Sequence, residues 1–241
     1  MNKLAKLDFY NKEIAKIQQE LFDKLDNVVV GLKTLNNTEL LQLAKQIDFF
    51  AEMEQLGYSS LLTRTSKAYD DEIAKIFAEL SRRELQRVPA ASVEILRQLK
   101  DFELNYLTGS VRQYADQLKN AMLRGFVTGQ TNIQIMNNLT TSFGVGTFIS
   151  SSETSFLIND AFATFSNATR AKAYEQFPDL TFKYIGPRDD KTRDACKKVF
   201  AEIEKRGPLT IDEINALTIP GFQGFSRRGG YNCRHDFVRV R

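Results

Sequence analysis

Residues 181–200 read TFKYIGPRDDKTRDACKKVF and begin with the pattern of a strand. Apolar Phe182 and Tyr184 alternate with polar neighbours, as they do in a strand with one buried face. The last residues of the chain, 234–241 (RHDFVRVR), also alternate and predict a second strand. We expect these two strands to pair antiparallel across the long segment between them. The sequence therefore predicts a small α+β domain with a short antiparallel sheet at its C-terminal end.

Helical patterns dominate the rest of the chain. In residues 3–28, apolar side chains recur at alternating steps of three and four, which predicts a long helix with a narrow, coiled-coil-like seam that contacts a helical partner. Further helices are predicted at residues 37–57, 70–88, 92–107, 109–129, within 124–144, and at 150–177. The fold class is thus mostly α (α+β), with a helical arm or bundle at residues 1–108 and the α+β domain at residues 109–241.

Several residue types predict where these helices begin and end. Asn37 or Thr38 is the expected N-cap of the second helix, and Gly57 is its expected left-handed C-cap. The pairs Ser150 with Glu153 and Thr210 with Glu213 fit the capping box, in which two backbone N–H groups are satisfied reciprocally.

The composition is that of an ordinary soluble globular protein, with 26% charged and 42% hydrophobic residues. No apolar run is long enough to cross a bilayer, and charges interrupt the apolar pairs of residues 1–19, so we expect no membrane partner and synthesis in a cytoplasm. The net charge is +3, but residues 181–241 hold thirteen Lys and Arg against eight Asp and Glu. The basic charge therefore lies with the C-terminal domain.

The chain has two cysteines and one histidine, namely Cys196, Cys233 and His235. On an extended strand, Cys233 and His235 project to the same side. Three interpretations are open: buried packing of two reduced cysteines beside a hydrogen-bonded histidine, a zinc site, or a disulfide between the cysteines. A zinc ion would need a fourth ligand such as Asp194 or Asp236. The spacing matches no zinc finger or ribbon, so we expect packing and no cofactor.

Two separated motifs, YIGPRDDKTRDACKKVF (184–200) and GGYNCRH (229–235), together resemble the Mu F-like minor head protein family of tailed bacteriophages, also called the phage head morphogenesis family. Members have a helix pair opened by G-x-[ST], here 129–131, then a strand, a D-x-x-T-R-x-x-C segment and an N-C-R-[CH] element. The resemblance covers about residues 110–241. The residues that match the two motifs are Asp189 or Asp190, Thr192, Arg193, Cys196, Asn232, Cys233, Arg234 and His235.

The resemblance implies a structural component of the phage head, attached near the portal vertex, that assists head assembly and DNA packaging or delivery. Its partners would be the portal protein, the capsid protein and packaged double-stranded DNA, which it would bind without sequence preference. It would be present in the host cytoplasm during assembly and in the virion afterwards. The motif residues would then hold a small domain together, and no reaction is implied.

Basic residues of the C-terminal domain form a second candidate site, for DNA phosphates. The residues are Arg227, Arg228, Arg239 and Arg241, joined by Arg234, Lys183 and Lys191. These cations would equally serve to protect a sheet edge. The chain contains no phosphate-binding glycine loop, and a single histidine makes a metal nuclease hard to assemble, so we expect no enzyme activity. The rival functions are a metal-dependent DNA-processing enzyme that uses Cys196, Cys233 and His235, and a DNA-binding accessory protein outside the virion.

Overall fold

The structure is a computed structural model that describes residues 8–31, 39, 42, 45–144, 152–230 and 233–240. The N-cap predicted at residues 37 and 38, the cap at Ser150, and the motif or basic residues Asn232 and Arg241 lie outside these ranges. Among the described residues, no helix has the length and apolar character needed to cross a membrane.

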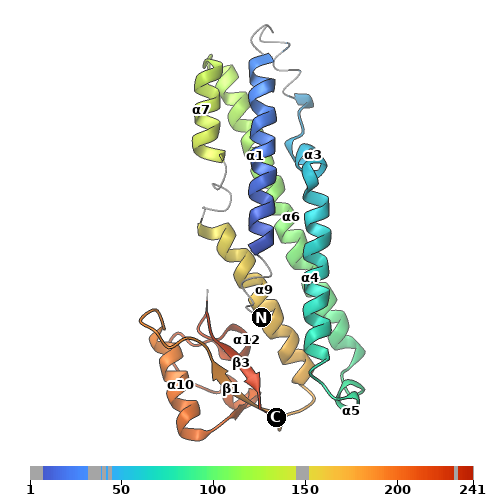
Figure 1. Ribbon diagram of the computed structural model, residues 1–241, viewed down its shortest axis with the longest axis vertical. Coiled ribbons are helices and arrows are strands. Elements are labelled where there is room, and N and C mark those ends of the chain that lie inside the picture. Colours follow the sequence, from blue (N-terminus) through green and yellow to red (C-terminus); the bar gives the residue numbers. More distant parts are fainter. Residues whose placement is uncertain are drawn as a thin grey trace. The chain divides into compact units, whose positions relative to one another are not determined.

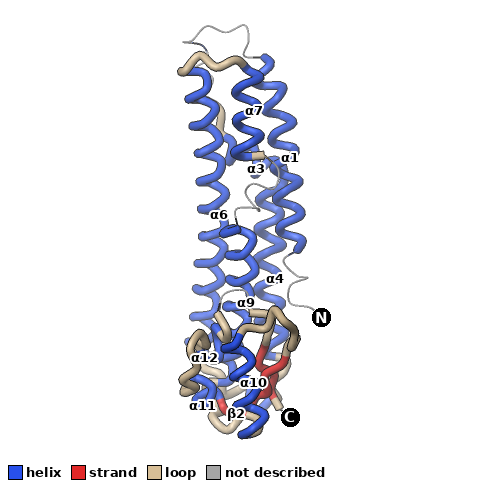
Figure 2. The backbone as a smooth tube through the Cα atoms, turned by 90° about the vertical axis from the view of Figure 1, so that its left-hand side faces the viewer, coloured by secondary structure: helices blue, strands red, loops and turns tan. Residues whose placement is uncertain are grey.

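The predicted fold class, mostly helical with a small antiparallel sheet, is confirmed (Figure 2). The helices are α1 (Asp8–Gly31), α3 (Phe49–Met53), the π-helical turn η3 (Glu54–Tyr58), α4 (Ser59–Phe77), α5 (Arg82–Leu85), α6 (Ala90–Val127), α7 (Asn132–Phe143), α9 (Ser152–Tyr174), α10 (Asp194–Arg206), α11 (Ile211–Asn215) and α12 (Gly224–Arg227). The strands are β1 (Thr181–Ile185), β2 (Leu209–Thr210) and β3 (Asp236–Arg239).

The chain divides into two compact units, each built from two separate segments. Unit 1 comprises Met1–Ala68 and Asp101–Ile158, and unit 2 comprises Tyr69–Lys100 and Asn159–Arg241. This division differs from the boundary expected near residue 108, which falls inside α6. A long-range core causes the difference, because residues of the 69–100 segment pack with the C-terminal sheet, a contact that local sequence patterns do not reveal.

Unit 1 is a helical bundle. Tyr10, Ile14, Ile17 and Leu21 form the seam predicted on the first helix, and all four are buried. Helix α1 contacts α3, η3 and α7, and Figure 1 shows α7 alongside it. The helical partner of the seam therefore lies within the chain.

Four predicted helix boundaries differ from the structure. The helix expected at 70–88 is not one helix, because α4 already begins at Ser59 and ends at Phe77, and the capping box of Ser81 starts the separate α5. The helix expected at 37–57 does not run through, because Asp48 is an extended N-cap whose side chain accepts a hydrogen bond from the Ala51 N–H to start α3. Gly57 is left-handed (φ 113°), as expected, but it kinks a helix that continues instead of ending it. The helices expected at 92–107 and 109–129 are one helix, α6. Glycine inside a helix costs only about 1 kcal/mol, which burial of Leu107 and Val111 on either side offsets.

Unit 2 contains the sheet, whose strand order is β2-β1-β3. The predicted antiparallel pairing of the two strands is confirmed, with Tyr184 opposite Phe237 in the register. Strand β2 was not predicted from the sequence, because its two residues are too few to show alternation. The capping box of Thr210 and Glu213 is present and starts α11 directly after β2.

The core of unit 2 is aromatic. The rings of Phe182, Phe225 and Phe237 pack in succession, with centroids 5.0 and 5.2 Å apart, and Tyr184 contacts Phe237 at 4.7 Å. Helix α10 lies against β1 (Figure 1), so its buried face closes this core. The core fixes β1, β3 and α10; Cys196 lies on α10, and the other described motif residues lie in the segments that follow β1 and precede β3.

Candidate functional site

The candidate site begins at the turn between β1 and α10. The Thr192 side chain is buried, and its hydroxyl donates to the Pro187 carbonyl at 2.9 Å and accepts from the Asp189 N–H at 3.0 Å. The Thr192 N–H donates to the Asp189 carbonyl at 2.9 Å. Arg193 then takes the extended N-cap conformation from which α10 begins. This threonine therefore fixes the direction in which the chain enters the helix.

The two motifs are joined by ionic and polar contacts. Both terminal nitrogens of Arg234 donate to the Asp189 carboxylate, at 2.7 and 2.5 Å, in the bidentate geometry that suits a guanidinium. The hydrogen bonds from Arg234 hold the pKa of Asp189 well below its usual range. Arg193 donates to the Gly229 carbonyl at 2.7 Å. The D-x-x-T-R segment is thereby bound to Arg234 of the N-C-R-[CH] element and to Gly229, which precedes that element.

Cys196, Cys233 and His235 meet beneath these contacts. Their ligand atoms all lie within 4.8 Å of one another. The two sulfur atoms are 3.8 Å apart, both cysteines are free, and the Cys233 sulfur is 3.7 Å from Nδ1 of His235. Cys196 and His235 are buried, and Cys233 is partly exposed. The Tyr184 hydroxyl donates to the Cys196 sulfur at 3.4 Å and lies 3.5 Å from the Cys233 sulfur.

The surroundings shift the pKa values of these groups. Burial raises the pKa of the Cys196 thiol. Burial also acts to raise the pKa of Cys233, but its contact with the Tyr184 hydroxyl and hydrogen bonds from two backbone N–H groups hold it below its ordinary value. Burial lowers the pKa of His235 and favours its neutral form. The cluster therefore combines a thiol whose pKa is lowered, a thiol whose pKa is raised and an imidazole whose pKa is lowered.

Glycines make room for this cluster. A Cβ atom at position 229 would lie 2.5 Å from the Cys196 sulfur and 3.2 Å from the Cys233 sulfur. At Gly186, where φ is 151°, a Cβ would lie 2.4 Å from Cδ2 of His235. Neither glycine belongs to the residues singled out as a site from the sequence. Both are needed because the backbone passes so close to the three side chains.

The two carboxylates considered as a fourth zinc ligand lie elsewhere. The Asp194 side chain is 89% exposed at the start of α10. Asp236 pairs with Arg170 at 2.8 Å and with Arg228 at 3.6 Å. Neither belongs to the cluster, so neither carboxylate supplies the fourth ligand that a zinc ion would need there. Asp190, the alternative first residue of the motif, is exposed in the turn.

Two of the basic residues expected to contact DNA have protein partners instead. Arg228 is buried, donates to the His235 carbonyl and pairs with Asp236, so the assignment of this side chain to phosphate is corrected. Arg239 pairs with Glu84 at 2.8 Å. The exposed basic side chains without an ion-pair partner in this part of the described chain include Arg227, Lys183 and Lys191.

Three groups that complete the site had no signal in the sequence. They are the Tyr184 hydroxyl, the Pro187 carbonyl and the buried Arg170–Asp236 ion pair. Tyr184 was identified only as an apolar strand residue, and a backbone carbonyl has no sequence signature. Such groups are found only when the tertiary structure brings them to the motif.

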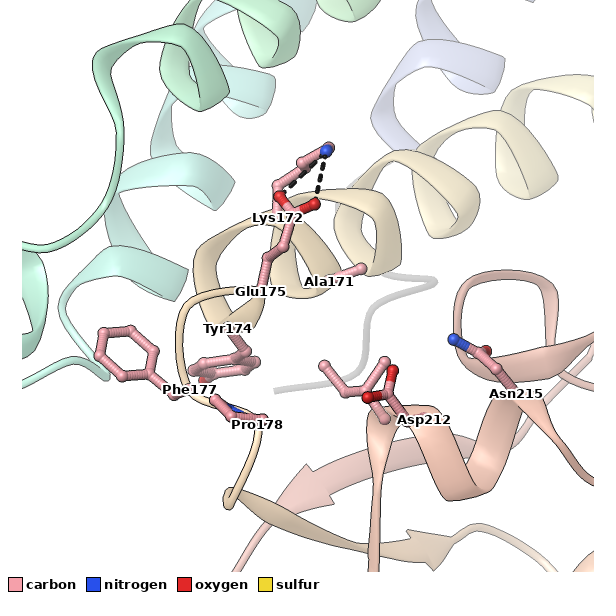
Figure 3. A pocket seen from close by; sticks show the side chains of 9 residues that line it. Ala171, Lys172, Tyr174, Glu175, Phe177, Pro178, Asp212 and Asn215 are labelled. Atoms are coloured by element: carbon pink, nitrogen blue, oxygen red, sulfur yellow. Dashed lines mark hydrogen bonds and ion pairs between the residues drawn. The ribbon is translucent and has the colours of Figure 1, made fainter.

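A pocket of about 260 Å³ lies at the end of α9, beside α11 (Figure 3). Its described lining contains Asp212, Asn215 and the ion pair of Lys172 with Glu175, and contains no cysteine or histidine. Because this lining holds ordinary polar groups and no nucleophile, we assign no reaction to the pocket. The candidate site is therefore the Cys/His cluster together with the Arg234–Asp189 ion pair and the hydrogen bond from Arg193 to the Gly229 carbonyl.

Comparisons with protein families, with curated proteins and with solved structures give no match for this chain.

Proposed function

We propose that the protein is a bacteriophage minor head protein, a structural component of the virion that attaches near the portal vertex and assists head assembly and DNA packaging or delivery. It is made in the host cytoplasm, where it binds the portal protein or the capsid protein before the head is complete. The proposed role is one of binding and does not include catalysis.

The observation that carries the proposal is the contact between the two motifs of the family resemblance. Asp189 and Arg234 are 45 residues apart in the chain and form a bidentate ion pair, and the Cys196 and Cys233 sulfurs lie 3.8 Å apart. Pairing of β1 with β3, which sets Ile185 opposite Asp236, brings the two segments together, and the matched side chains of Asp189 and Arg234 then bond to each other where they meet. Their meeting supports the resemblance, and the structural nature of the contacts supports an assembly role.

The decisive experiment locates the protein in particles purified from cells that carry the phage genome encoding this chain. We expect a low copy number relative to the capsid protein and chemical cross-links to the portal protein. The matched control is the same cross-linking reaction on heads that lack the portal, which should give no such products. Absence of the protein from mature particles and from assembly intermediates would refute the proposal.

A second experiment tests the DNA contact. We expect weak binding at low salt that is insensitive to sequence, and the slope of log affinity against log salt should fall by about 0.9 for each phosphate that is no longer neutralised. Arg227, Lys183 and Lys191 are to be changed together to Gln, which removes the charges. Arg206→Gln is the control, because its guanidinium already binds Glu213 at 2.9 Å. Unchanged affinity in the triple variant would place the DNA contact elsewhere.

The rival function, a metal-dependent nuclease, is tested in the same samples. We expect no cleavage with magnesium, manganese or zinc, because the Asp194 and Asp236 carboxylates lie outside the Cys/His cluster and so supply it with no general base. Cleavage by the wild type that disappears in His235→Ala would favour the enzyme over the head protein.

A further inference from the structure

We propose that Cys196, Cys233 and His235 bind one Zn²⁺ ion through both sulfurs and Nδ1, with solvent as the fourth ligand. This assignment replaces the simple packing expected from the sequence. It concerns the folding of unit 2 and does not depend on the proposed function.

The distances between the ligand atoms fit the edges of a zinc tetrahedron. With Zn–S of about 2.3 Å and Zn–N of about 2.0 Å, two sulfurs should be about 3.8 Å apart, and sulfur and nitrogen about 3.5 Å. The observed separations are 3.8 Å between the sulfurs and 3.7 Å from the Cys233 sulfur to Nδ1 of His235. Two of the three edges thus match those of a zinc tetrahedron, and the third, from the Cys196 sulfur to the His235 nitrogen, is no longer than 4.8 Å.

The histidine is oriented as a metal ligand. Its Nε2 lies 2.7 Å from the Pro187 carbonyl oxygen, which can only accept, so Nε2 must carry the proton. In the neutral ring, Nδ1 then has its lone pair free and faces the Cys233 sulfur. A metal-binding histidine characteristically donates its other N–H to a carbonyl or a carboxylate, which fixes the ring and its tautomer.

The surrounding groups suit thiolates bound to a cation. The Tyr184 hydroxyl donates to the Cys196 sulfur, and a hydrogen bond of this kind from outside the ligand set orients a ligand. Two thiolates balance the charge of a divalent ion, and the nearby Arg228 is already paired with Asp236. A set of two sulfurs and one imidazole selects zinc over magnesium or calcium, which prefer oxygen ligands.

The fourth position is left for solvent. Among the residues that the structure describes, no additional cysteine, histidine or carboxylate joins the three. Cys233 is partly exposed, which gives water a path to the ion. The ion would connect the start of α10 to the segment that leads into β3, and so hold both ends of the motif pair together.

The assignment is tested on the full chain, reduced and stripped of metal with a chelator, by titration with Co²⁺ as a spectroscopic probe. We expect saturation at about one equivalent, with a thiolate-to-cobalt charge-transfer band and the strong visible bands of tetrahedral cobalt. Added Zn²⁺ should abolish these bands, and excess Mg²⁺ should leave them unchanged.

Two variants and one control identify the ligands. Each of the variants Cys233→Ser and His235→Gln should lose the thiolate-to-cobalt charge-transfer band or the visible bands of tetrahedral cobalt. Asp194→Asn, which changes an exposed side chain two residues from Cys196, should bind like the wild type. Circular dichroism checks that each variant is folded, and the wild-type titration decides the question if one of them is not. A reduced wild type that gives no charge-transfer band, or binding unchanged in both ligand variants, would overturn the assignment.

Discussion

Gly229→Ala is expected to destabilise unit 2 through a purely steric effect. The new Cβ would lie 2.5 Å from the Cys196 sulfur, closer than any real side-chain contact, and 3.2 Å from the Cys233 sulfur. Gly229 is not in the left-handed region, so alanine adds no backbone strain there. The Cys196 side chain is 1% exposed on a helix that closes the aromatic core, which leaves its sulfur little room to move.

The expected magnitude follows from other buried insertions of a methyl group. Forcing an extra carbon into a packed site costs about 1–3 kcal/mol. The clash here involves two sulfur atoms, one of them far inside contact distance, so we expect about 2 kcal/mol or more. The same displacement should separate the sulfurs and weaken Co²⁺ binding.

Thiol labelling as a function of urea reports this unit specifically, since both cysteines of the chain lie in unit 2. In metal-free, reduced protein, the variant's thiols should become reactive at lower urea, with the slope of free energy against urea unchanged. The control is Gly109→Ala, in helix α6 of unit 1, where an added Cβ meets nothing within 4 Å.

The control variant should behave in the opposite way. Alanine at position 109 should stabilise unit 1 by about 0.5–1 kcal/mol, seen by circular dichroism, because a helix-interior glycine is entropically costly. It should not shift the labelling midpoint of the two cysteines downward. If Gly229→Ala labels at the same urea concentration as the wild type, the backbone does not approach the sulfurs closely and the steric reasoning fails.

Of three further changes in unit 2, the first two can be followed by the same labelling, and the third by circular dichroism, because the reactive thiolate is lost at low pH. Asp236→Asn leaves the buried Arg170 without its partner and should cost about 3 kcal/mol; a decrease below about 1 kcal/mol would mean that the pair is solvated. Thr210→Ala removes the α11 cap and should cost about 1 kcal/mol, whereas Thr210→Ser should cost little. The Ser81 backbone N–H and Arg239 lower the pKa of Glu84 from 4.5 to about 2, so its stabilisation is complete above pH 4.5 and disappears toward pH 2. Glu84→Gln should therefore destabilise at pH 7 and match the wild type near pH 2.

The sequence by itself determined the local elements. Alternation predicted strands at residues 181–186 and 234–240, which contain β1 and β3, since one buried face imposes a period of two. Three- and four-residue spacing identified α1, and the Thr210 capping box marked the start of α11. These features depend on neighbours within a few residues, so the residues that cause each element can be read directly in the sequence.

For the candidate site, the sequence singled out only part of the residue set and did not indicate the state of those residues. It grouped Cys196, Cys233 and His235 but left packing, metal and disulfide open, because residue types without distances fit all three. The separations and the hydrogen bond that fixes the His235 tautomer come only from the fold. For Arg228 the sequence was misleading. Its positive charge predicted an exposed phosphate contact, but the side chain is buried and paired with Asp236, which excludes it from a DNA-binding surface.

Only the tertiary structure decided how the chain divides into units. Ile76 and Leu80 belong to a helical segment that lies far before the sheet in sequence, yet both pack in the core that contains Phe182 and Phe237. The apolar spacing of a helix specifies a buried face but not what covers it, because hydrophobic burial is non-directional and any complementary surface satisfies it. The packing of the whole chain decides which surfaces meet. That packing also brings the motif residues into contact with one another.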